Sequence, residues 1–162
     1  MADYVVDTNV WIMVDKSLED VTTQTELDCI EACRQWLAAF MKSADRLVVD
    51  ADYQILGEYR TYAKPSRQLA NSWLNQLERA PRNKLVYIEN IQYDDHSHAI
   101  IPFDLDRKDR KFVAVALAHK PKPPIVTATD TDWDEAKDRL KAVGLTVIEL
   151  CPDYIAEKRA QK

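Results

Sequence analysis

Residues 4–11 read YVVDTNVW, a short apolar run that leads directly into an acid, a hydroxyl and an amide. Short runs rich in β-branched residues are typical of buried β-strands. Four further runs share this composition, and they lie at residues 47–49, 85–88, 125–126 and 145–150. The pattern therefore predicts five short strands, and Asp7 follows the first of them directly.

Segments with helical spacing separate these strands. Apolar residues recur every three or four positions at 27–41, 55–62, 69–80, 112–117 and 133–143, and Gly144 is placed to cap the last segment. A regular alternation of strands and helices is typical of an α/β domain whose mainly parallel sheet is covered on both faces. We therefore expect an α/β fold with a central, mainly parallel five-stranded sheet.

Length and composition favour one domain over residues 1–162, because the chain has 162 residues and 46% of them are hydrophobic. Residues 152–162 are interpreted as a polar C-terminal tail or a short helix. No apolar run approaches the roughly 18 to 20 residues that span a bilayer, and the first residues do not resemble a secretion signal. We expect a cytoplasmic protein without a membrane partner.

Glycine and cysteine usage excludes several kinds of site. Gly57 and Gly144 are the only two glycines, so GxGxxG and GxxxxGK loops, and the nucleotide binding that depends on them, are excluded. Cys29, Cys33 and Cys151 are odd in number and lack the CxxC pairs of a zinc site. We expect them to be buried or neutral thiols in a reducing cytosol.

The net charge of −5 argues at first against a nucleic-acid partner, because Lys and Arg supply most phosphate contacts. However, acids that are concentrated around divalent cations present a nearly neutral surface. The net charge therefore does not exclude a nucleic acid.

Acids follow two of the predicted strands. Asp7 follows the first strand, and Asp130 and Asp132 follow the strand at 125–126. In parallel α/β sheets, ligands bind outside the carboxyl ends of the strands, where such residues converge. A single acid at a strand end is also common as a helix cap or turn former, so Asp7 alone does not predict a site.

Asp109 adds a different signal. It opens a predicted helix and lies three, four and seven residues before apolar positions, so its carboxylate shares the buried face. Burying an unpaired carboxylate costs several kcal/mol, so a basic partner or a metal must compensate. Asp104 and Asp106 lie in the preceding loop, where solvated or capping roles are expected.

Glu58 borders the buried stripe of the helix at 55–62 in the same way. Gly57 beside it has no side chain, so we expect another group to approach the helix closely at that turn. This would explain a glycine here, although glycine lowers the stability of a helix by about 1 kcal/mol. An exposed helix glutamate is the alternative. Oxygen-only ligands favour Mg²⁺ or Mn²⁺ over zinc, and such cations activate water for phosphodiester hydrolysis.

Four segments in this order resemble the PIN-domain family, in particular the VapC-like toxin ribonucleases of toxin–antitoxin pairs. They are YVVDTNVW, VVDADYQILGEYRTY, DRKFVAVALAH and PIVTATDTDW. The resemblance implies a three-layer α/β/α fold and an endoribonuclease that depends on Mg²⁺ or Mn²⁺. It also implies homodimerisation and inhibition by a small antitoxin protein.

The resemblance also implies roles for individual residues. By this resemblance, Asp7, Glu58, Asp109 and Asp130 would be the catalytic, metal-binding acids. Asp132 would either share the metal or cap the next helix. The segment TATDTDW holds one residue more than the family's commoner Thr-x-Asp spacing. The choice between Asp130 and Asp132 as the fourth metal-binding acid therefore stays open. Thr8 or Asn9 would orient Asp7, and Thr127 would support the pocket by hydrogen bonding.

Candidate RNA contacts surround these acids. Trp11 could stack a base, with core or dimer packing as the alternative. Arg110 and Lys111, with Arg107 and Lys108, could hold RNA phosphates, with a solvated helix face as the alternative. His96 and His98 are expected to be solvated rather than to bind a metal.

Three other classes of protein are alternatives to a toxin. A PIN-like RNA-processing nuclease would act without an antitoxin. A receiver-type signalling domain also gathers aspartates around Mg²⁺, but it needs an acidic pair on the first strand, an acceptor Asp on the third and a Lys after the fifth. The third predicted strand instead ends Ile88-Glu89-Asn90. A PIN-like protein-binding module would lose acids, whereas at least four are present here.

Overall fold

The computed structural model describes residues 1–91 and 105–162. Its central sheet has five strands in the order β3-β2-β1-β4-β5, and every neighbouring pair is parallel. The strands are β1 (Asp3–Val6), β2 (Arg46–Asp50), β3 (Leu85–Ile88), β4 (Ile125–Thr127) and β5 (Val147–Glu149). The predicted five-stranded parallel sheet is confirmed, although β5 is shorter than the apolar run at 145–150.

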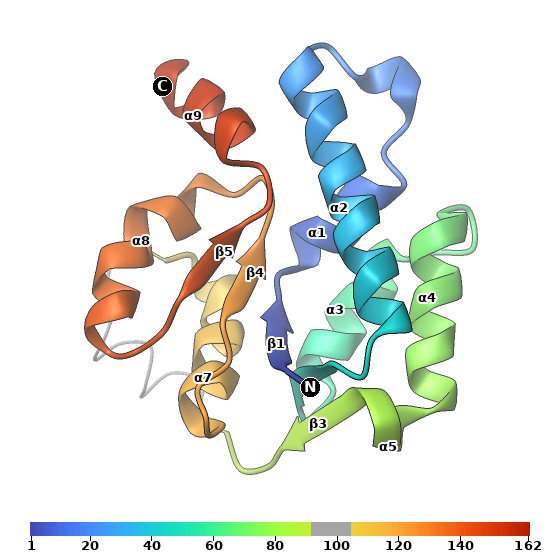
Figure 1. The fold of residues 1–162 in the computed structure, drawn as a ribbon, viewed down its shortest axis with the longest axis vertical. Coiled ribbons are helices and arrows are strands. Elements are labelled where there is room, and N and C mark those ends of the chain that lie inside the picture. Colours follow the sequence, from blue (N-terminus) through green and yellow to red (C-terminus); the bar gives the residue numbers. More distant parts are fainter. Residues whose placement is uncertain (92–104) are drawn as a thin grey trace.

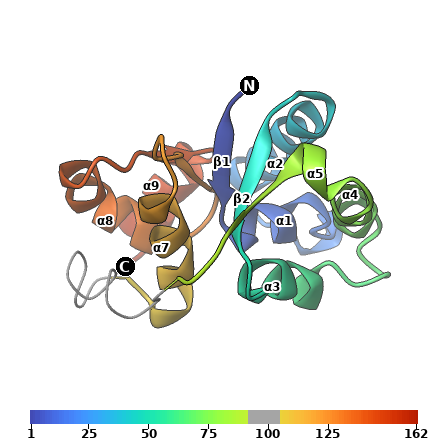
Figure 2. The ribbon, with the colours of Figure 1, turned by 90° about the horizontal axis from the view of Figure 1, so that it is seen from below.

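Helices cover both faces of this sheet. They are α1 (Thr8–Val14), α2 (Gln24–Lys42), α3 (Gln54–Tyr62), α4 (Gln68–Arg79), α5 (Pro81–Lys84), α7 (Arg110–Ala118), α8 (Thr131–Ala142) and α9 (Pro152–Ala160), with 3-10 helices η1 (Leu18–Asp20) and η2 (Arg107–Asp109). Figures 1 and 2 show α7 and α8 on one side of the sheet and α1, α2 and α4 on the other, which makes three α/β/α layers. Within the two described ranges, no helix combines the length and the apolar character needed to cross a membrane.

The strand order explains where a ligand can bind. The chain moves outward from β1 through β2 to β3, then returns to the other side of β1 to form β4 and β5. The direction of winding therefore reverses between β1 and β4, and their carboxyl ends form the crevice that ligands use in open α/β sheets. Val5 and Val6 of β1 pair with Ile125 and Val126 of β4, which brings Asp7 and Thr127 side by side.

All five predicted helices are present, as α2, α3, α4, α7 and α8. Gly144 follows the last of these with φ +82°, a left-handed conformation suited to glycine, and its N–H donates to the Lys141 carbonyl at 3.0 Å. The C-terminal segment is a helix rather than a tail, since α9 begins with Pro152 in its first turn. Helix α1 was not predicted, because Asp7, Thr8 and Asn9 have turn preferences that conceal its start.

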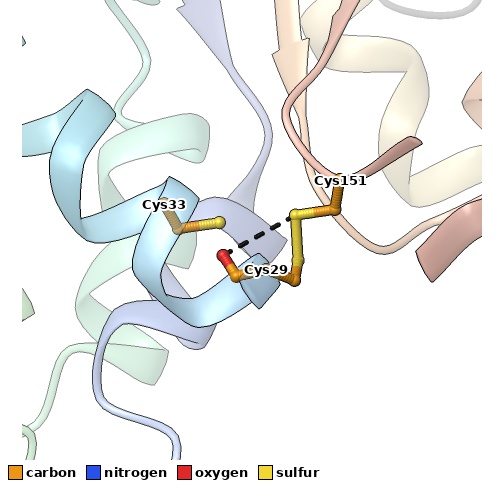
Figure 3. A group of neighbouring side chains, drawn as sticks. All are labelled: Cys29, Cys33 and Cys151. Atoms are coloured by element: carbon orange, nitrogen blue, oxygen red, sulfur yellow. Dashed lines mark hydrogen bonds between the residues drawn. A yellow bond between two sulfur atoms is a disulfide. The ribbon is translucent and has the colours of Figure 1, made fainter. Parts of the chain in front are cut away.

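The expectation of three free thiols is wrong. Cys29 and Cys151 form a disulfide across 122 residues of sequence, with their Cα atoms 5.1 Å apart, and Cys33 alone is a free, buried cysteine (Figure 3). The bridge joins α2 to the residue that precedes α9. Spacing could not reveal it, because the two cysteines meet only when α9 packs against α2.

Candidate active site

An acidic groove of about 460 Å³ lies at the carboxyl ends of β1 and β4. Its lining residues are Asp7, Thr8, Asn9, Ile12, Glu58, Thr61, Tyr62, Lys108, Asp109 and Asp130. Four of the five predicted metal-binding acids therefore meet in one groove, although they come from separate parts of the chain. The fifth, Asp132, has a carboxylate oxygen within 4.8 Å of those of Asp109 and Asp130.

Asp7 is 3% exposed and lies between β1 and α1. Asp7 is the N-cap residue of α1, but its side chain makes no capping hydrogen bond, so its carboxylate is not used as a helix cap. Its Oδ2 instead accepts hydrogen bonds from Asn9 Nδ2 at 2.5 Å, Trp133 Nε1 at 2.6 Å and Thr127 Oγ1 at 3.4 Å. These donors come from α1, α8 and β4, so the orientation of Asp7 depends on three elements packing together.

Trp133 is the donor that the sequence analysis missed. Its helical spacing indicated only a core position, and the ring is indeed fully buried. The one signal in the sequence was the aromatic residue after the acids in PIVTATDTDW. Asn9 also accepts a hydrogen bond from the Ala128 N–H at 2.9 Å, and this ties the ends of β1 and β4 together.

Thr8 contacts a different acid from the one expected. Its Oγ1 donates to Glu58 Oε1 at 2.5 Å, so Thr8 orients Glu58 while Asn9 orients Asp7. The other Glu58 oxygen, Oε2, forms an ion pair with the Lys111 ammonium. Both oxygens of Glu58 are therefore held by protein groups.

Asp109 is 3% exposed and lies where η2 meets α7. It makes no capping hydrogen bond, and its helix buries Phe112, Val113 and Ala116 completely, as the spacing indicated. Its Oδ2 is buried and has no hydrogen-bond partner among the residues that the structure describes. A buried carboxylate oxygen without a partner is costly, and it points to a ligand that the oxygen would bind.

Burial and mutual repulsion raise the pKa values of two acids in the groove. Burial, and then the negative charges of Asp130 and Glu58, raise the pKa of Asp7 to about 7 against the opposing hydrogen bond from Trp133. Burial, followed by the charges of Asp7 and Asp130, raises the pKa of Asp109 to about 8. Clustered acids of this kind fit a hard divalent cation, because its charge favours their ionised forms and its ligands are oxygens.

Asp130 caps α8, because its Oδ1 accepts a hydrogen bond from the Asp132 N–H at 2.9 Å. The alternative in which Asp132 caps this helix is therefore wrong. Asp130 also lines the acidic groove, and burial and the charge of Asp130 raise the pKa of Asp132. Both acids lie close enough to Asp109 to share a cation with it.

Two predicted RNA contacts are wrong. Trp11 is 1% exposed and packs against the Tyr59 ring, with centroids 5.3 Å apart, so it cannot stack a base. Lys111 is 8% exposed, and its ammonium contacts Glu58, the Lys108 carbonyl and the face of Phe112. It is an internal partner of an acid rather than a phosphate contact. Arg110 is half-buried and does not belong to the lining of the groove in the described ranges.

Tyr62 and Lys108 line the acidic groove, whereas Trp11 and Lys111 do not belong to its lining in the described ranges. Tyr62 was placed on the buried face of its helix, but it is 42% exposed and lines the acidic groove. Lys108 is exposed and lines the groove beside Asp109. The apolar spacing predicted a buried Tyr62, but Tyr62 is the last residue of α3 and lies beyond the core.

The structure tests some of the expectations for residues near the acids, namely Gly57, Asp106, His96, His98 and Asp104. Among the described residues, a Cβ atom on Gly57 would meet only the Tyr53 ring, at 3.5 Å, which is an ordinary contact, so the close approach expected at this turn stays a prediction. Asp106 caps η2 by accepting a hydrogen bond from the Lys108 N–H at 3.2 Å, which is one of its two expected roles. His96, His98 and Asp104 lie outside the described residues.

Asp50 is a buried acid with a structural role. It ends β2, and its two oxygens accept hydrogen bonds from the Gln54 and Ile55 N–H groups, each at 2.8 Å. These donors belong to the first turn of α3, so Asp50 holds the start of the helix that carries Glu58.

Comparisons with family models, with curated proteins and with solved structures find no significant match to this chain.

Proposed function

We propose that the chain is a PIN-type endoribonuclease that depends on Mg²⁺ or Mn²⁺. The observation that carries the proposal is the buried Asp109 Oδ2, which lacks a partner among the described residues in a groove that Asp7 and Asp130 also line. Three acids of this kind repel one another unless a cation binds between them. The order of the four PIN-like segments supports the same conclusion.

The residues of the groove have separate roles in this proposal. Asp7, Asp109 and Asp130, with Asp132 beside them, hold the cation. A bound Mg²⁺ or Mn²⁺ ion supplies an activated water and stabilises the charge that develops on a phosphodiester. Asn9, Thr127 and Trp133 hold Asp7 in the orientation that the cation requires.

Glu58 has a different environment from the other acids. Thr8 and Lys111 hold its two oxygens, so the cation would have to replace one of these partners to bind Glu58 directly. We therefore propose that Glu58 faces the groove as a positioned acid, close enough to bind the cation through a water molecule.

The rim of the groove suits a single-stranded RNA. Tyr62 offers an exposed aromatic ring, on which an unpaired base can stack. Lys108 offers an exposed ammonium beside the acids, where a phosphate would lie. We propose that Tyr62 takes the stacking role expected of Trp11, and that Lys108, one of the four expected basic contacts, binds phosphate while Lys111 does not.

The strand order disfavours the receiver-type alternative. In receiver domains the first and third strands are neighbours, in the order 2-1-3-4-5. Here β2 lies between β1 and β3, so an acceptor on β3 would be separated from the acid that follows β1. The groove also lies at the β1–β4 switch point rather than beside β3.

The proposal is tested by RNA cleavage with purified protein and Mn²⁺ or Mg²⁺. Asp7→Asn and Asp109→Asn should each abolish cleavage while the circular dichroism spectrum stays unchanged. Asp138→Asn is the matched control, because Asp138 is an exposed acid on α8 that does not line the groove, and it should keep full activity. Full activity in both groove variants would overturn the assignment.

Within this class we propose the toxin of a type II pair, which would form a homodimer and be inhibited by a small antitoxin. The alternative is an RNA-processing nuclease without an antitoxin. Expression of the wild-type chain should arrest growth, expression of Asp109→Asn should not, and co-expression of a small neighbouring reading frame should restore growth. Unimpaired growth with an active enzyme would favour the alternative.

A further inference from the structure

Three cysteine sulfurs lie together, away from the acidic groove. Cys29 and Cys33 are four residues apart on α2 and so share a face, while Cys151 lies at the start of α9. The three sulfur atoms lie within 4.8 Å of one another, and Figure 3 shows the Cys33 sulfur pointing toward the bridge between the other two. A disulfide needs only two sulfurs, so the role of the third requires an explanation.

We propose that the reduced protein binds one Zn²⁺ ion through Cys29, Cys33 and Cys151, and that the Cys29–Cys151 disulfide abolishes this site. Tetrahedral Zn²⁺ with Zn–S bonds of about 2.3 Å holds its sulfur ligands about 3.8 Å apart. Sulfurs that already lie within 4.8 Å reach this separation by small side-chain rotations once the S–S bond is broken. Two ligands four residues apart on one helix face are a known arrangement for zinc.

The conversion between the two states balances in electrons and protons. A dithiol reductant gives two electrons and two protons to the Cys29–Cys151 bond, which becomes two thiols while the dithiol becomes a disulfide. Zn²⁺ then replaces the three thiol protons, which pass to solvent. The Cys151 sulfur lies 3.7 Å from the Cys29 carbonyl oxygen, so the reduced thiol has an acceptor within reach (Figure 3).

Charge favours a divalent ion over a monovalent one. Three thiolates and Zn²⁺ carry a net charge of −1, whereas three thiolates and Cu⁺ carry −2, and a larger buried charge costs more free energy. Cys29, Cys33 and Cys151 are each at most 5% exposed, so this difference matters. The N-terminal end of α9, which begins after Cys151, also stabilises negative charge on that sulfur.

A cavity of about 190 Å³ beside the sulfurs supplies a path and a fourth ligand. Cys29 and Cys151 line it, together with the exposed acids Asp28 and Asp153. Zinc sites with three protein ligands complete their coordination with water or another oxygen from an open side. A water molecule, or either carboxylate, would occupy the fourth position from this cavity.

The test uses Co²⁺ as a spectroscopic substitute for Zn²⁺ on the whole chain. The protein is reduced with a dithiol, freed of the reductant without air, and titrated with Co²⁺. One equivalent should produce thiolate-to-cobalt charge-transfer bands and the visible bands of tetrahedral Co²⁺, and one equivalent of Zn²⁺ should remove them. Cobalt in the acidic groove gives no sulfur bands, so this result is independent of the nuclease proposal.

Two matched samples complete the experiment. Oxidised wild-type protein should show no sulfur bands, because its disulfide removes two ligands. Cys33→Ala keeps Cys29 and Cys151, so it should retain the disulfide and the oxidised circular dichroism spectrum but lose the bands after reduction. The proposal is wrong if reduced wild-type protein shows no bands, if reduced Cys33→Ala shows the same bands, or if reduction unfolds the chain.

Discussion

Lys111 forms an ion pair with Glu58, which lines the acidic groove, although the two residues belong to α7 and α3. The Lys111 side chain is 9% exposed and the Glu58 side chain is 24% exposed. The pair places a buried positive charge next to one of the acids of the groove. Lys111 therefore offsets part of the repulsion in the groove before any cation binds.

Lys111→Met should lower the stability of the metal-free protein, because it leaves Glu58 without its charged partner. The expected loss is on the order of 1 to 3 kcal/mol, below that for a fully buried pair because Glu58 is partly exposed. Added Mn²⁺ should restore more stability in the variant than in the wild type. Urea unfolding with and without Mn²⁺ measures both effects, and Lys141→Met, at an exposed position on α8 that does not line the groove, is the control. Equal stability of Lys111→Met and wild type would contradict this role.

The metal-free protein should lose stability as pH rises from about 4 to 8. The pKa of Asp7 is raised from 3.8 to about 7 and that of Asp109 from 3.8 to about 8, so in this window the folded state holds protons that the unfolded chain releases. Their contribution to the free energy of unfolding is therefore constant below about pH 4, falls through the window and is constant again above about pH 8.

Asp109→Asn isolates this effect, because it removes one of the two shifted groups. In the presence of a chelator, the variant should gain stability over the wild type as pH rises, by about 1 to 3 kcal/mol at pH 8. Urea unfolding at pH 5, 6.5 and 8 measures the difference, with Asp138→Asn as the control. A difference that does not change with pH would disprove this explanation.

Trp133→Phe should shift the pH dependence of Mn²⁺ binding to higher pH. The Trp133 Nε1 donates to Asp7 Oδ2 at 2.6 Å and lowers the pKa of that carboxyl, so the loss of this donor makes Asp7 harder to ionise. Protons then compete with the cation over a wider range. Titration calorimetry between pH 6 and 8.5 measures the midpoint. Trp73→Phe on α4 should leave the midpoint unchanged, and an unchanged midpoint in Trp133→Phe would refute the prediction.

Asp130→Asn should reduce RNA cleavage without reducing the stability of the fold. Asparagine caps helices as well as aspartate does, so the variant should keep its stability but lose the charge that the cation needs. Asp130→Ala should lose about 1 kcal/mol of stability as well. Cleavage assays and thermal unfolding distinguish these effects. If Asp132→Asn reduces Mn²⁺ affinity more than Asp130→Asn does, the fourth metal-binding acid is Asp132.

Tyr62→Ala should weaken RNA binding about 5-fold to 150-fold, because stacking on an aromatic ring contributes about 1 to 3 kcal/mol per base. The Mn²⁺ affinity should not change. Tyr87→Ala is the matched control, since Tyr87 is 47% exposed on β3 and is not part of the groove lining in the described ranges. Binding of a single-stranded RNA to the Asp109→Asn background, in which the proposed function predicts no cleavage, provides the measurement. Equal affinities of the two tyrosine variants would exclude a stacking role for Tyr62.

Local patterns were sufficient for most of the fold. The run at 85–88 is β3, residue for residue, because it is too short for a stable helix and rich in β-branched and aromatic residues, which favour strands. The positions of Phe112, Val113 and Ala116 likewise placed Asp109 on the buried face of α7. Helix α1 was missed because its first residues favour a turn, and the helix depends on packing Val10 and Trp11 into the core.

The sequence by itself placed Asp7, Glu58 and Asp109 at a strand end or on buried helix faces, because short-range periodicity sets strand ends and helix faces. The choice of partners was decided only by the tertiary structure. Lys111 pairs with Glu58, Trp133 donates to Asp7, and Cys29 is bonded to Cys151. Each pair joins residues from elements that are distant along the chain. Their proximity depends on how the layers pack on the sheet, and neither spacing nor composition carries that information.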